Sequence, residues 1–151
     1  MSDAAQSTFV YVTYIRTSAE KLWAALLQPQ FTRQYWFGMD MVSDWQVGSS
    51  WQLRFADGRI ADTGEVLEVD PPRRLVLRWR NEFRPELKAE GPAQCTFELE
   101  PSGEIVKLTI THSSEHPNSR VIVAVSGGWP KILSNLKSLL ETGKPMMTER
   151  L

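Results

Sequence analysis

Cys95 and His112 have side chains that could act together in catalysis. A two-residue loop at residues 102–103 would place them diagonally across two antiparallel strands, at ~7 to 8 Å. A cysteine beside a base can be an activated nucleophile. This separation is too long for a direct hydrogen bond, however, and a lone buried cysteine usually serves as a small apolar filler. We therefore name no catalytic residue and favour a protein that is not an enzyme.

His112 is also a candidate by itself. It has the same strand parity as Leu108 and Ile110, so its side chain should point inward, near the rim at the strand end. An imidazole there could orient a ligand or exchange protons near neutral pH. The alternative is a histidine that bonds a neighbouring backbone group and supports the core.

A glutamate of the strand expected over residues 60–69 should also face the interior. The loops at its two ends turn Glu68 inward, whereas matching the apolar faces turns Glu65 inward. A bulge at Gly64 could reconcile the two patterns. A buried carboxylate needs a partner or a raised pKa. It would either reach the rim or a backbone donor, or anchor a polar ligand group.

Tryptophans offer a different kind of site. Trp23 and Trp129 lie on apolar stripes at helical spacing, which is typical of packing. Trp36, Trp51 and Trp79 could instead be ligand platforms, because each ring offers a large rigid face and one N–H donor.

Composition limits the partners. The 151 residues are 42% hydrophobic and 23% charged, the balance of a soluble globular protein. We expect a single domain over residues 1–151 with an ordered core of about residues 8–143. The net charge of −1 argues against a nucleic-acid partner, and no apolar run approaches the ~20 residues of a membrane-spanning helix.

Further signals for metals, nucleotides and export are missing from the sequence. No Cys/His cluster has metal-ligand spacing, and Gly127-Gly128 does not follow a strand as a phosphate loop would. We expect no metal and no cofactor. Residues 1–7 lack the basic and apolar segments of a secretory signal, which predicts a cytoplasmic protein.

Strand patterns dominate the chain. Residues 8–16 are β-branched and aromatic and predict the first strand. A capped helix should follow residues 17–20, and a second short helix should cover about residues 29–36. Further strands are expected over residues 41–46, 50–55, 60–69, 74–80, 94–100 and 104–112. The polar residues 81–92, with two prolines, predict an exposed loop.

The patterns of the last two expected strands agree with each other. The loop at residues 102–103 places Leu99 opposite Val106, with the pairs Phe97–Leu108 and Cys95–Ile110 following. One face is then apolar and the other polar, as in a half-buried antiparallel sheet.

The C-terminal segment predicts an amphipathic helix. Over residues 129–141 the apolar residues recur at 3.6-residue spacing, and Gly143 and Pro145 end the pattern. Its beginning is open, because Pro130 suits a first helical turn and residues 121–125 alone would pass for a strand.

Four motifs point to a known family: Tyr35-Trp36-Phe37-Gly38, Asp44-Trp45-Gln46-Val47-Gly48, the stretch GEVLEVDPPRRL at residues 64–75, and Gly127-Gly128-Trp129. Together with the C-terminal helix they resemble the family named for the activator of the large heat-shock chaperone's ATPase, in the START-like (SRPBCC) helix-grip superfamily. The resemblance covers about residues 8–143.

This resemblance implies an α+β fold. A curved antiparallel sheet of about six or seven strands should surround a long C-terminal helix, with two short helices after the first strand. Residues 121–125 would then form the front half of that long helix, bent at Gly127-Gly128.

The resemblance also implies a cavity between sheet and helix, whereas residue types alone favour a filled core. The predicted cavity-lining residues are Tyr11, Thr13, Trp36, Trp51, Leu53, Phe55, Leu77, Trp79, Cys95, Phe97, Leu108, Ile110, His112, Trp129, Leu133 and Leu136.

Our leading hypothesis is a monomer or homodimer that binds a small hydrophobic or amphipathic molecule in this cavity. Alternatives are a chaperone-interacting or other protein-interaction module, and a cavity enzyme of the cyclase or hydrolase type.

Overall fold

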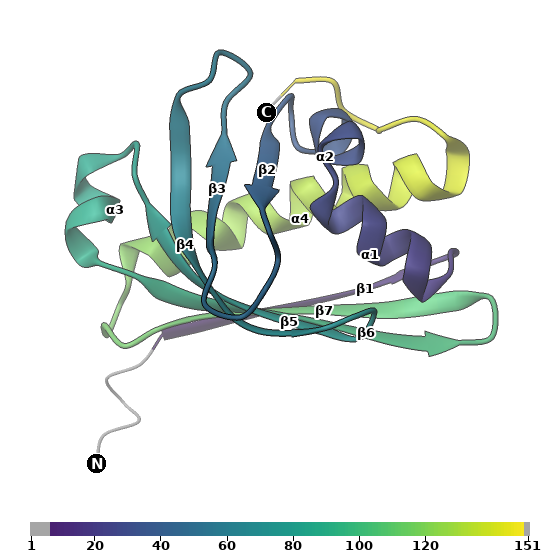
Figure 1. Ribbon diagram of the computed structural model, residues 1–151, viewed down its shortest axis with the longest axis horizontal. Coiled ribbons are helices and arrows are strands. Elements are labelled where there is room, and N and C mark those ends of the chain that lie inside the picture. Colours follow the sequence, from purple (N-terminus) through teal and green to yellow (C-terminus); the bar gives the residue numbers. More distant parts are fainter. Residues whose placement is uncertain (1–6, 150–151) are drawn as a thin grey trace.

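The part of the chain that the structure describes folds into seven strands and four helices. The computed structural model describes residues 7–149 (Figure 1). In chain order the elements are β1 (Ser7–Ile15), α1 (Ala19–Leu27), α2 (Pro29–Tyr35), β2 (Asp40–Ser43), β3 (Ser50–Arg54), β4 (Ile60–Asp70), β5 (Arg74–Asn81), α3 (Pro85–Glu90), β6 (Ala93–Ser102), β7 (Ile105–Ser114) and α4 (Arg120–Thr142).

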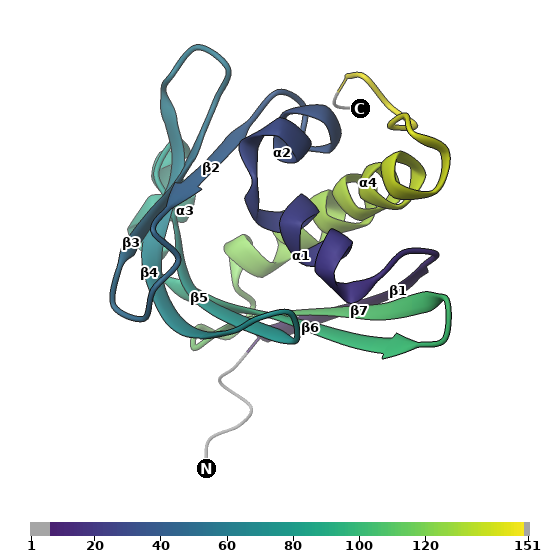
Figure 2. The same ribbon diagram turned by 45° about the vertical axis from the view of Figure 1, so that its right-hand side comes forward.

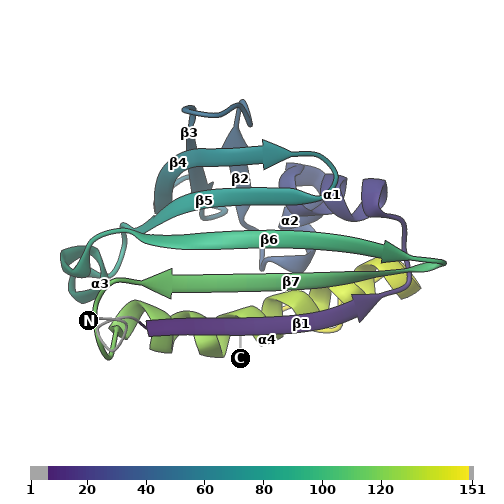
Figure 3. The same ribbon diagram turned by 90° about the horizontal axis from the view of Figure 1, so that it is seen from below.

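The strands form one antiparallel sheet in the order β1-β7-β6-β5-β4-β3-β2. The sheet curves, and α4, α1 and α2 all lie on its concave side (Figure 2). Seen from below, β1, β7, β6, β5 and β4 run side by side, with α4 behind β1 and β7 (Figure 3). This arrangement confirms the predicted helix-grip fold and the two short helices after the first strand.

Alternating residues of the strands meet α4 in one core. Along β7 every second side chain is buried, which is the pattern of a strand with one wet face. Phe97, Ile110 and Leu136 belong to a single hydrophobic cluster. The predicted inward faces and the helix stripe therefore share one interior.

The β6–β7 register differs from our prediction by two residues. Leu99 lies opposite Leu108, Phe97 opposite Ile110, and Cys95 opposite His112. The loop is residues 103–104 instead of 102–103, because Gly103 takes φ +63° at the first loop position, as a type II′ turn requires. A shift of two residues keeps each side chain on its predicted face.

Residues 81–92 are not simply an exposed loop, as we had predicted. They contain α3, which begins at Pro85, a residue that suits a first helical turn. Leu87 of α3 is buried against Val121 of α4. This apolar contact outweighs the polar composition of the segment and builds a wall beside α4.

α4 is one 23-residue helix that includes residues 121–125, as the family resemblance implied. Ser119 caps its start by accepting a hydrogen bond from the Ile122 N–H (3.2 Å), and Gly143 ends it with φ +88°. Pro130 lies inside the helix rather than in its first turn. Across residues 7–149, no helix is both long enough and apolar enough to span a membrane.

Candidate ligand pocket

A pocket of about 420 Å³ lies between the front half of α4, α3 and the neighbouring ends of β3, β4 and β5. Its lining is mainly aromatic and aliphatic, with three polar side chains. The lining residues are Trp36, Met39, Leu53, Phe55, Asp62, Trp79, Asn81, Phe83, Arg84, Leu87, Val121, Ala124, Val125, Gly128, Trp129 and Ile132.

Three tryptophans form one continuous wall of this pocket. The ring centroid of Trp36 lies 6.1 Å from that of Trp79 and 5.4 Å from that of Trp129, and the Trp79 and Trp129 centroids are 5.7 Å apart. Distances in this range are typical of favourable aromatic pairs. The wall is therefore aromatic and closely packed.

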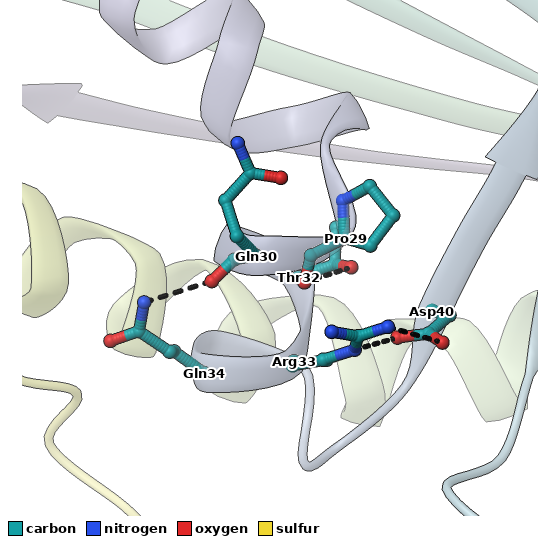
Figure 4. Close-up of polar contacts among 6 residues, drawn as sticks. All are labelled: Pro29, Gln30, Thr32, Arg33, Gln34 and Asp40. Atoms are coloured by element: carbon teal, nitrogen blue, oxygen red, sulfur yellow. Dashed lines mark hydrogen bonds and ion pairs between the residues drawn. The ribbon is translucent and has the colours of Figure 1, made fainter.

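Trp36 and Met39 enter the pocket from the loop between α2 and β2. An ion pair closes this loop: Arg33 Nε lies 2.6 Å from Asp40 Oδ1, and Arg33 Nη2 lies 3.2 Å from Asp40 Oδ2 (Figure 4). The Trp36 N–H also donates to the Thr32 carbonyl at 2.8 Å. These contacts fix the position at which Trp36 leaves α2.

His112 orients the Trp129 ring from the core side of the pocket wall. The indole N–H of Trp129 donates to His112 Nδ1 at 3.1 Å. His112 is 0% exposed, so our expectation of an imidazole near the rim is wrong: α4 covers this end of β7. Burial lowers the pKa of His112 to about 4. Because Nδ1 accepts, the neutral ring carries its proton on Nε2.

Cys95 lies directly opposite His112, not diagonally across from it. The thiol is fully buried, and burial raises its pKa well above the ordinary range. A neutral thiol is a poor nucleophile. Cys95 therefore has the properties of an apolar core residue.

Trp51 supports the tryptophan wall from the sheet. Its indole N–H donates to the Arg78 carbonyl at 3.0 Å, and its ring contacts Trp79 at 4.5 Å between centroids. The contact requires Gly64, because a Cβ there would lie 1.7 Å from the Arg78 carbonyl oxygen. Gly64 thus allows β4, β5 and Trp51 to approach one another.

Neither glutamate of β4 faces the interior, contrary to our prediction. Glu65 pairs with Arg78 (3.0 Å) and Glu68 pairs with Arg74 (2.7 Å), and all four side chains are about half exposed. The register shift lies between Val66 and Glu68, not at Gly64, and turns both glutamates outward.

The acidic residue of the pocket is instead Asp62, which is 8% exposed. Its parity matches that of Gly64 and Val66, so strand alternation alone could have indicated it. Asn81 lies opposite Asp62 on β5, and Arg84 follows just before α3. The polar part of the lining is thus gathered around the end of β5.

Five of the predicted cavity residues line this pocket: Trp36, Leu53, Phe55, Trp79 and Trp129. Nine others are buried in the core outside the lining, namely Trp51, Leu77, Cys95, Phe97, Leu108, Ile110, His112, Leu133 and Leu136. Tyr11 and Thr13 of β1 are partly exposed and also lie outside it. Ligand contact by any predicted residue stays a prediction.

A second hollow, of about 350 Å³, lies on α1 and α2 beside β2. Trp23, Leu27, Val42 and Trp45 are among its lining residues. None of its lining residues belongs to the first pocket, so the two hollows can be distinguished by experiment.

A curved antiparallel sheet that holds a long C-terminal helix, with a pocket between them, defines a protein of the START-like, helix-grip class. The chain belongs to the family described as Activator of Hsp90 ATPase homolog 1-like protein, whose family model matches residues 16–141. The resemblance inferred from the sequence motifs is therefore confirmed.

Several solved structures share this fold. A protein of Mesorhizobium loti is 27% identical with a TM-score of 0.75, over 89% of this chain and 97% of that one. The Aha1 dimer of Colwellia psychrerythraea is 22% identical (TM-score 0.74; 91% and 98% covered). An HSP90 activator of Plasmodium falciparum is 21% identical (TM-score 0.71; 88% and 95% covered). Among curated proteins, none matches the chain.

Proposed function

We propose that this protein binds a small, largely apolar molecule in the pocket between α4, α3 and the sheet. The main support for this proposal is the lining of the pocket, in which five aromatic side chains surround a space of about 420 Å³. Ligand sites typically have volumes of about 300 to 1,000 Å³, apolar walls and a few polar groups. The pocket has each of these properties.

Gly128 keeps this space open. It lies inside α4, where glycine costs roughly 0.5 to 1 kcal/mol relative to alanine. A Cβ built on Gly128 meets no atom within 4 Å, and the residue lines the pocket. Gly127 has equally open surroundings but is exposed and lies outside the lining. The two adjacent glycines therefore form a matched pair for an experiment.

The test compares Gly128→Phe with Gly127→Phe, using the neutral dye N-phenyl-1-naphthylamine and its fluorescence. Wild type and Gly127→Phe should bind one dye with equal affinity. Gly128→Phe should bind at least about tenfold more weakly, because its ring occupies the site. Circular dichroism and the Tm confirm that both variants fold. Equal dye binding by all three folded proteins would overturn the proposal.

A protein partner is a second candidate function. It is supported by the family description and by the names of two neighbours, an HSP90 activator and a dimeric Aha1. The test is the ATPase rate of Hsp90 with and without this protein, combined with light scattering for its oligomeric state. An unchanged ATPase rate and no complex would argue against chaperone activation.

A further inference from the structure

We propose that the ligand carries a neutral oxygen acceptor, such as a ketone, ester or amide carbonyl, which is held by the indole N–H groups of Trp36 and Trp79. This inference rests on the proposed function and specifies its ligand.

The tryptophan indoles around the pocket differ in whether their N–H groups already have an acceptor. Trp129 donates to His112 Nδ1 at 3.1 Å, and Trp51 donates to the Arg78 carbonyl at 3.0 Å. For Trp36 and Trp79, we find no hydrogen bond from the indole N–H to another residue within the described range 7–149. Two of the three tryptophans that line the pocket therefore retain an unused donor.

The indole nitrogens of Trp36 and Trp79 are also accessible. Within residues 7–149, His112 Nε2 is the one side-chain nitrogen or oxygen that is completely buried and lacks a partner. The Trp36 and Trp79 nitrogens are thus not sealed inside the protein. Their residues are only 4% and 6% exposed, and both line the pocket, so the pocket gives the access.

The two donors belong to adjacent rings of the tryptophan wall. The Trp36 and Trp79 rings are nearly parallel, at 25°, with centroids 6.1 Å apart. Asn81 follows two residues after Trp79 in β5, and its Oδ1 already accepts from the Arg84 N–H at 2.9 Å. Its amide therefore presents NH₂ donors. A largely apolar pocket with several donors suits a ligand that has an acceptor oxygen on an apolar body.

The charges of the lining favour a neutral acceptor over a carboxylate. The lining contains one acidic and one basic residue, Asp62 and Arg84, so it has no excess of basic side chains to attract an anion. The Arg84 guanidinium bonds Glu86 at 2.9 Å and is about half exposed, which leaves it partly neutralised. A ligand carboxylate would place a second acidic group beside Asp62, which is 8% exposed, and would lose hydration there, whereas a neutral carbonyl would not add a charge.

The experiment compares two tricyclic probes of nearly the same shape, 9-fluorenone and fluorene, which differ in a carbonyl group. One hydrogen bond should make fluorenone bind about 2- to 10-fold more tightly. Trp36→Phe and Trp79→Phe should each reduce this ratio while fluorene still binds. Trp23→Phe, at the second hollow, is the matched control and should leave the ratio unchanged.

A second readout uses the unmodified protein, in case a variant fails to fold. In ¹H–¹⁵N spectra, the indole N–H protons of Trp36 and Trp79 should move downfield with fluorenone more than with fluorene, and those of Trp51 and Trp129 should respond equally to both. Equal affinities with equal indole shifts would overturn this inference and leave the proposed function standing. Binding of neither probe would overturn both.

Discussion

Acidification should destabilise this protein through His112. Burial lowers the pKa of His112 from 6.5 to about 4 in the folded chain. Between these values the unfolded chain binds a proton that the folded chain does not, so stability falls as the pH falls. The stability that the neutral His112 contributes is intact above pH 6.5 and is fully lost below about pH 4. A difference of about 2.5 pKa units corresponds to about 3 kcal/mol.

The assay is urea unfolding of wild type and His112→Gln between pH 7.5 and pH 4. Glutamine can still accept the Trp129 N–H but does not titrate. As the pH falls, wild type should therefore lose about 3 kcal/mol of unfolding free energy relative to His112→Gln. A constant difference would refute the reasoning. An NMR titration midpoint of His112 near pH 6.5 would refute it as well.

Three further predictions concern stability. Gly64→Ala should lower the free energy of unfolding by about 1 to 3 kcal/mol, because its Cβ would overlap the Arg78 carbonyl. An unchanged free energy of unfolding in urea would contradict that packing. Leu136→Ala should lower the free energy of unfolding by about 2 to 5 kcal/mol, since Leu136 is fully buried. A decrease below about 1 kcal/mol would contradict the central position of α4 in the core. Burial would raise the pKa of Glu90, but hydrogen bonds from Ser119 and from the first N–H groups of α4 lower it overall. Glu90→Gln should therefore cost about 1 kcal/mol at pH 7, and this gap should shrink as the pH falls below about 4.5; a gap that is the same at pH 3.5 would argue against the cap.

Residue alternation predicted the faces of the sheet well. A strand has a side-chain period of two, so the two-residue error at Gly103 left Phe97 and Ile110 facing the core. The length of α4 could not be read from its residues alone, because residues 121–125 also suit a strand. There the family motifs supplied what periodicity could not.

The pocket was harder to predict than the core. Much of its wall comes from α3 and the start of α4, whose contact through Leu87 and Val121 depends on tertiary packing. The glutamates of β4 were misplaced because a bulge can occupy any of several positions in a strand. Finally, an inward residue such as Ile110 can fill a core or line a space, and only the arrangement of all the elements decides which.

The most direct test of the proposed function is the position of a bound apolar molecule. Intermolecular NOEs can be measured between N-phenyl-1-naphthylamine and the methyl groups of the protein when the protein is saturated with this dye. The account predicts NOEs to Leu87, Val121 and Ile132, which line the pocket beside α4. NOEs to Leu27 and Val42 of the second hollow instead, or none to either set, would contradict it.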